Sequence, residues 1–250
     1  MIKKSQTGHD SNVTNFQTAI GYVSELGVTY KPSKASLMMP ELTGQHLTCK
    51  KAVVDTAKAK TDLTTAITQR EKLYDQMDPL AIRIGKAMES SDMEEGDMED
   101  VYRELAKVKS YETGKGKQTP PKSTTPADGN DKAPRKNAPG KTMDNRLKSF
   151  TNALTLLENN PSYVPNETDL ASSGLRAFEV NVINANELVG LLELRVNNLI
   201  ISRNNSMYLG KNNLIKMAED LKAYMIAAFG KNSVAAKRMN KLVFTGLKEK

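Results

Sequence analysis

The sequence has few of the residues that catalytic and metal sites require. Its 250 residues include one cysteine, two histidines and no tryptophan. One cysteine cannot form an internal disulfide, and two histidines are too few for most metal centres. The sequence therefore predicts no cofactor, no small-molecule substrate and no enzymatic activity.

Long apolar runs are also absent. No stretch of about 18 apolar residues occurs, so we expect no transmembrane segment. Lys3 and Lys4 near the N-terminus are not followed by the apolar segment of a secretory signal. Together with the single cysteine, this pattern predicts a cytoplasmic protein.

Apolar and aromatic side chains are scarce enough to restrict the fold class. Hydrophobic residues make up 38% of the chain and aromatic residues 5%. Such a composition cannot fill a wide globular core, but it can fill the narrow seams between long helices. No segment has the alternation typical of a β-strand. The sequence predicts an all-α protein.

A basic segment without large apolar side chains lies in the middle of the chain. Residues 113–142 contain no Val, Ile, Leu, Met, Phe, Tyr or Cys, and they hold five of the ten prolines. Because nothing in this segment can offset the entropy of ordering it, we expect a flexible linker. Two aspartates partly balance its seven basic residues, which are Lys115, Lys117, Lys122, Lys132, Arg135, Lys136 and Lys141. The linker thus carries most of the net charge of +7.

The segments on either side of this linker resemble each other at a nearly constant spacing. The signature pairs, each separated by 133 positions, are Tyr30 and Tyr163, Pro32 and Pro165, and Arg70 and Arg203. One residue of slippage then aligns Tyr74 with Tyr208. We interpret the chain as a tandem repeat, with a first helical unit at 1–112, the linker at 113–142 and a second helical unit at 143–250.

Each repeat is expected to contain one long helix and several shorter helices. The long helices, of about 40 residues, are predicted at about 35–77 and 168–209, because apolar or small residues recur there in steps of four and three. The shorter helices are predicted at 12–26, 79–88 and 99–110 in the first repeat, and at 147–157, 213–229 and 233–243 in the second. The side chains of the second seam are Phe178, Val182, Ala185, Val189, Leu192, Val196, Leu199 and Arg203.

Three phrases of the second repeat, SYVPNETDL, ISRNNSMYL and LKAYMIAAFGKNS, carry a family resemblance. With the two-copy layout and the Lys/Pro-rich middle, they resemble a family of uncharacterised helical proteins common in Bacteroidota. The resemblance implies the two-unit helical layout and a bacterial cytoplasmic origin. It implies no activity and no site residues.

The candidates for chemistry have ordinary structural interpretations. Cys49 falls in the seam of the first long helix, where a small buried thiol is expected. His46 aligns with Glu179, at a position expected to be solvated. The acidic run at 89–100 does not match the spacing of a calcium loop, and we interpret it as a solvated helix junction.

Arg70 and Arg203 occupy seam positions where an apolar residue would be usual. In one interpretation each aliphatic stem packs while the guanidinium reaches a carboxylate or a helix end. In the other, both arginines line a shared site for an anion or a partner.

Two functions remain open from the sequence. The first is a structural or interaction protein that assembles with itself or with a protein partner. The alternative is non-specific nucleic-acid binding by the basic linker and the C-terminal tail, where the candidate contacts are Lys237, Arg238 and Lys241.

Overall fold

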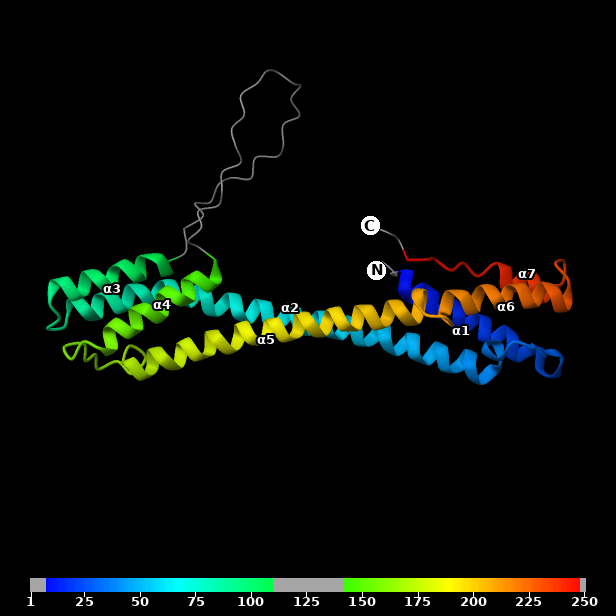
Figure 1. Ribbon diagram of the computed structural model, residues 1–250, viewed down its shortest axis with the longest axis horizontal. Coiled ribbons are helices and arrows are strands. Elements are labelled where there is room, and N and C mark those ends of the chain that lie inside the picture. Colours follow the sequence, from blue (N-terminus) through cyan, green and yellow to red (C-terminus); the bar gives the residue numbers. More distant parts are fainter. Residues whose placement is uncertain (1–7, 110–141, 248–250) are drawn as a thin grey trace, which may run out of the picture. The chain divides into compact units, whose positions relative to one another are not determined.

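The computed structural model describes residues 8–109 and 142–247, and every regular element in these residues is helical (Figure 1). The all-α prediction is therefore confirmed. Of the predicted linker, only Thr142 belongs to the described residues, where its side chain accepts a hydrogen bond from the amide of Asn145 at the start of α4. No helix in the described ranges combines the length and apolarity needed to cross a membrane.

The helices lie close to the predicted ranges. The first half contains α1 (Gly8–Leu26), two short 3₁₀ turns, η1 (Gly27–Thr29) and η2 (Ala35–Leu37), α2 (Met39–Glu89) and α3 (Glu95–Val108). The second half contains α4 (Met143–Glu158), α5 (Ser172–Asn204), the π-helical turn η3 (Asn205–Leu209), α6 (Leu214–Phe229) and α7 (Val234–Asn240).

One predicted boundary is wrong, because α2 continues through Pro79 for 51 residues instead of ending near residue 77. Proline lacks an amide hydrogen and costs about 3 kcal/mol within a helix, so the sequence favours a break there. Packing overrides that cost, since Met77, Ala81 and Ile84 around the proline are all fully or almost fully buried.

The chain forms two compact units, which divide it differently from the sequence repeats. Unit 1 consists of residues 1–65 and 190–250, and unit 2 consists of residues 66–189. Each unit therefore combines helices from both halves of the chain. Unit 1 contains α1, α6 and α7 with the start of α2 and the end of α5; unit 2 contains α3 and α4 with the end of α2 and the start of α5 (Figure 1).

The long helix α2 explains this exchange. At 1.5 Å per residue, 51 residues extend over roughly 75 Å. Its residues up to 65 belong to unit 1 and its later residues belong to unit 2, so this one helix contributes to both units. The elements that sequence similarity places in one repeat are consequently shared between two cores.

The core of unit 1 joins α1 to α6 and α7. Its fully buried side chains come from the N-terminal helix, from the start of α2 and from the C-terminal helices, among them Phe16, Leu42, Cys49, Leu214 and Leu221. Cys49, predicted to lie in the seam of the first long helix, is buried as expected, and Thr56 and Ala59 further along α2 are buried as well.

The core of unit 2 contains a buried arginine that sequence reasoning did not single out. Arg146 of α4 is 8% exposed and donates hydrogen bonds to the carbonyls of Val108 at 2.7 Å and Tyr74 at 2.9 Å. It also pairs with Asp78 at 2.8 Å, and its guanidinium lies 5.5 Å from the centre of the Tyr74 ring. This one side chain thus fixes the ends of α3 and α4 to α2.

The π-helical turn η3 lies where the repeat alignment slips by one residue. The spacing is 133 from the pair Tyr30 and Tyr163 to the pair Arg70 and Arg203, and 134 at Tyr74 and Tyr208, and a π turn accommodates one extra residue in a helix. The amide of Gly210 donates to the carbonyl of Asn205, five residues earlier, at 2.8 Å. A side chain at Gly210 would place its Cβ 2.8 Å from the same oxygen, so this turn requires glycine.

Candidate functional site

The basic residues predicted to contact an anion or partner are mostly not in the described part of the chain. Lys115, Lys117, Lys122, Lys132, Arg135, Lys136 and Lys141 all lie in residues 110–141, outside it. Lys237 and Lys241 are exposed at α7. Arg238 already has partners within the protein: it forms an ion pair with Glu25 at 2.7 Å, and its guanidinium lies 4.2 Å from the centre of the Tyr22 ring.

Arg70 and Arg203 belong to different compact units, Arg70 to unit 2 and Arg203 to unit 1. The Nε atom of Arg70 is buried and has no hydrogen-bond partner among the described residues. In the same part of the chain, the guanidinium of Arg203 bonds to Oδ1 of the adjacent Asn204 alone, at 2.9 and 3.3 Å. The proposal of one site shared by both arginines therefore has no support from the described geometry, and each must be considered in its own unit.

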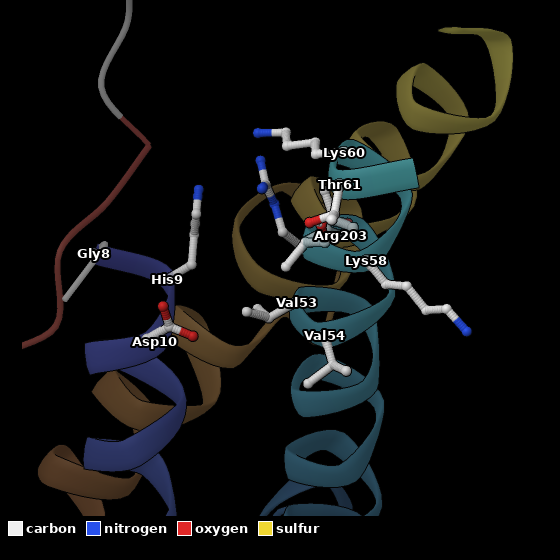
Figure 2. Close-up of a pocket in the computed structure, with 11 residues that line it drawn as sticks. Gly8, His9, Asp10, Val53, Val54, Lys58, Lys60, Thr61 and Arg203 are labelled. Carbon is white, nitrogen blue, oxygen red and sulfur yellow. Dashed lines mark hydrogen bonds between the residues drawn. The ribbon is translucent and has the colours of Figure 1, made fainter. Parts of the chain in front are cut away.

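Arg203 lines a groove of about 710 Å³ in unit 1. The groove lies between the start of α1 and residues 53–61 of α2, and the end of α5 closes it (Figure 2). Figure 2 shows the nitrogen ends of His9, Lys60 and Arg203 directed toward the same space, whereas the Lys58 side chain points away from it.

The charge in this groove is unbalanced. Arg203 is only 9% exposed, and burial lowers the pKa of its guanidinium. Within residues 8–109 and 142–247, neither Arg203 nor Lys60 forms an ion pair with a carboxylate. Asp10 is the acidic residue of the lining, and in Figure 2 its carboxylate lies away from the nitrogen ends of Arg203 and Lys60.

His9 is held by a short chain of hydrogen bonds. Its Nδ1 lies 2.6 Å from the hydroxyl of Tyr208, which also lies 3.4 Å from Nδ2 of Asn12. Two hydrogen bonds to Thr245 orient the Asn12 side chain. Its Nδ2 donates to the backbone carbonyl of Thr245 at 2.8 Å, and its Oδ1 accepts from the backbone amide of Thr245 at 2.9 Å. Asn12 therefore donates to Tyr208, and in the His9 tautomer whose Nδ1 carries no proton, Tyr208 donates to Nδ1.

This arrangement leaves a neutral His9 with its Nε2–H as the remaining donor. Burial, followed by the charges of Arg203 and Lys60, lowers the pKa of His9, while Asp10 acts in the opposite direction. A neutral imidazole can still donate a hydrogen bond to a bound anion. When no anion is bound, it adds no third positive charge to those of Arg203 and Lys60.

Asn12 could have been found from the sequence, because it aligns with Arg146 at the spacing of 134. Both side chains are buried, and they contact Tyr208 and Tyr74, which are themselves aligned at that spacing. His9 and Lys60 carry no such signal, because they are ordinary polar residues in sequence and only the fold brings them to Arg203.

Cys49 is a buried thiol, as expected from its position in the seam. It is 0% exposed, and burial raises its pKa to about 12. Gln45, one turn earlier, donates to the carbonyl of Ser206 in η3 at 2.7 Å, and the Cys49 sulfur lies 3.5 Å from the same oxygen. These two side chains thus bind a carbonyl of the π turn.

The expectation that His46 and Glu179 are solvated is wrong. His46 is 6% exposed, with a buried and unpartnered Nδ1, and Glu179 is 5% exposed. Glu179 is compensated by Arg176 at 2.8 Å and by a hydrogen bond from Thr151. His46 lies against α1, and Glu179 lies against α4. The pattern within one helix cannot reveal such a contact with another helix. No group of three or more potential metal ligands occurs in the described ranges.

The second surface feature is an apolar face on α5. Leu191, Leu194 and Ile201 are 66%, 63% and 59% exposed and fall within one side of the helix. Val180, Ile183 and Leu188 on the same helix are also exposed. Isolated exposed leucines are common, but several large exposed apolar side chains on one side of a helix indicate a binding surface.

Comparisons of the chain with protein-family models, with curated proteins and with solved structures find no match. The resemblance to the Bacteroidota family stays a prediction.

Proposed function

We propose that the protein is a non-enzymatic interaction protein that assembles with a second copy of itself through the exposed face of α5. The observation that carries this proposal is the set of large apolar side chains on that face, led by Leu191 and Leu194. Burying such side chains in an interface is favourable by roughly 25 cal/mol per Å² of apolar surface, before the costs of association.

The polar residues around this face favour a second copy as the occupant. Glu187 and Arg195 lie four residues before and four residues after Leu191, and Asn184 and Asn198 lie seven residues before and after it. Glu187 and Arg195 are exposed and form no ion pair with another described residue.

This symmetric order suits two α5 helices that pack antiparallel. With Leu191 of each copy at the centre, Glu187 of one copy faces Arg195 of the second copy, and Asn184 faces Asn198 of the second copy. A two-fold interface of this kind repeats every contact twice, so one charge pair and one amide pair become two of each. The apolar side chains then supply the affinity, while the polar pairs set the direction and the register.

The test is the mass of the full chain by sedimentation and by native mass spectrometry at increasing concentration. We expect a dimer that Leu191→Gln with Leu194→Gln converts to the 27.5 kDa monomer. Glutamine keeps the helix propensity high, so the fold is preserved. Val28→Gln is the matched control, because Val28 is 86% exposed but lies outside α5, and this variant should remain dimeric.

Charge reversal tests the register. Glu187→Arg places like charges opposite each other and should weaken the dimer, whereas Glu187→Arg combined with Arg195→Glu restores opposite charges and should recover it. A wild-type monomer at every concentration, or a dimer insensitive to the double glutamine change, would overturn the proposal.

The nucleic-acid alternative is distinguished in the same experiment. Of its candidate contacts in the described ranges, Arg238 is already paired with Glu25. If nucleic acid held the copies together, nuclease treatment would dissociate them and the assembly would weaken steeply with added salt. Assembly through α5 should survive both treatments.

A further inference from the structure

The groove at Arg203 has features of a ligand site that self-assembly through α5 does not use. Two permanent cations, Lys60 and Arg203, direct their nitrogen ends to one space without a carboxylate partner in the described ranges (Figure 2). Arg203 is withdrawn from water, so its charge cannot be solvated as a surface arginine would be. A buried cation without a counter-charge is costly unless an anion binds beside it.

We propose that this groove binds the phosphoryl group of a small phosphate ester. Arg203 offers a planar pair of N–H donors that match two oxygens of a tetrahedral anion. Lys60 supplies a second positive charge, and Nε2–H of His9 supplies a neutral donor. Two cations close to one space favour a doubly charged phosphoryl group over a singly charged carboxylate.

The remaining lining suits the organic part of such a ligand. Val53 and Ala57 of α2 contribute apolar surface to the groove, one turn apart. A volume of about 710 Å³ falls within the range of small-molecule sites. The ligand would therefore place its phosphoryl end at Arg203 and its ester group along α2.

Isothermal titration calorimetry of the full chain with phenyl phosphate and with inorganic phosphate tests this assignment. We expect both to bind, the ester more tightly, and acetate at the same concentration to show no binding. Lys60→Met should weaken binding roughly tenfold to hundredfold, which corresponds to the loss of one charge-assisted hydrogen bond. Arg203→Met should weaken it at least as much.

Lys58→Met is the matched control, because the Lys58 stem lines the same groove as Lys60 while its ammonium end points away from the nitrogen cluster, and methionine keeps the stem (Figure 2). It removes the same charge and should leave binding within about twofold, since surface charges at a distance are screened by salt. Should Arg203→Met fail to fold, Lys60→Met and His9→Gln still decide the question, because both residues are more accessible.

A pH series with sulfate, which stays dianionic, isolates His9. Anion binding should strengthen as the pH falls, because a bound anion helps His9 to take up a proton against the charges of Lys60 and Arg203, and Asp10 assists. His9→Gln should remove this dependence.

Equal weakening by Lys58→Met and Lys60→Met would show only non-specific attraction and would overturn the proposal. Binding of a short single-stranded oligonucleotide, but not of phenyl phosphate, would also overturn it by assigning the site to a nucleic-acid backbone. Absence of binding by any phosphate probe would do so as well.

Discussion

Tyr30 and Tyr163, 133 positions apart, make the same hydrogen bond. The hydroxyl of Tyr30 donates to the carbonyl of Leu37 at 2.6 Å, and the hydroxyl of Tyr163 donates to the carbonyl of Leu170 at 3.0 Å. Each bond closes the extended segment that joins a short helix to a long one. Burial raises the pKa of both phenols, so both keep the proton that they donate.

Tyr163→Phe should lower the free energy of unfolding by about 1 kcal/mol, because it removes one hydrogen bond and leaves a buried carbonyl without its donor. Tyr30→Phe should have a similar effect at the equivalent place. Urea denaturation of each variant measures the change. Tyr102→Phe serves as a comparison at an exposed residue, where the hydroxyl lies 3.0 Å from the Gly85 carbonyl and 2.8 Å from Glu89, and a larger loss for Tyr102 would contradict the assignment.

Arg146 is expected to be the most sensitive charged residue of unit 2. Arg146→Met leaves two carbonyls and Asp78 without their donor and should cost about 2–4 kcal/mol in the free energy of unfolding. Arg103→Met removes an exposed pair with Asp100 and should cost less than about 1 kcal/mol. Comparable losses for the two variants in thermal or urea unfolding would show that Arg146 does not hold the helix ends together.

Two glycines of α5 should respond in opposite directions to alanine. A Cβ at Gly174 would lie 2.1 Å from the carbonyl oxygen of Thr168, so Gly174→Ala forces the segment before the helix to move and should cost at least about 1–3 kcal/mol. At Gly190 no atom lies within 4 Å of the added Cβ. Gly190→Ala should therefore stabilise the helix by about 0.5–1 kcal/mol. A stabilising alanine at Gly174 would contradict the close approach.

Stability should fall as the pH drops from about 7 toward 5. Burial, followed by the charge of Lys50, lowers the pKa of His46 in the folded state, so the unfolded chain binds the proton first. Protonation then favours unfolding in the window below the unfolded pKa of about 6.5. His46→Gln should flatten this part of the curve in urea unfolding at several pH values. An unchanged slope would exclude His46 as the cause, leaving His9, whose pKa is also lowered.

Sequence patterns were sufficient for the helices and their buried faces. The steps of four and three along α5 depend only on which side of one helix is apolar, and Val182, Val189 and Val196 are buried accordingly. The slippage between Arg203 and Tyr208 marked the site of the π turn, although it did not reveal its geometry.

Contacts between helices from different repeats could not be predicted in the same way. Equivalent side chains in the two repeats fit the same neighbours, so sequence similarity cannot tell whether α1 packs with α3 or with α7. The fold decides this, because α2 contributes its residues up to 65 to unit 1 and its later residues to unit 2. The groove at Arg203 escaped prediction for the same reason, because His9, Lys60 and Arg203 meet only after α1, α2 and α5 have been assigned to one unit.

The division of the chain into units also sets an order of folding during synthesis. Unit 2 is complete once residue 189 has left the ribosome, whereas unit 1 needs residues 190–250. At about 5–20 residues per second, α1 emerges on the order of ten seconds before α6 and α7, with which it forms its core. Helix α1, although made before unit 2, is among the last helices to be fully buried, because Phe16 shares its core with residues of α6 and α7.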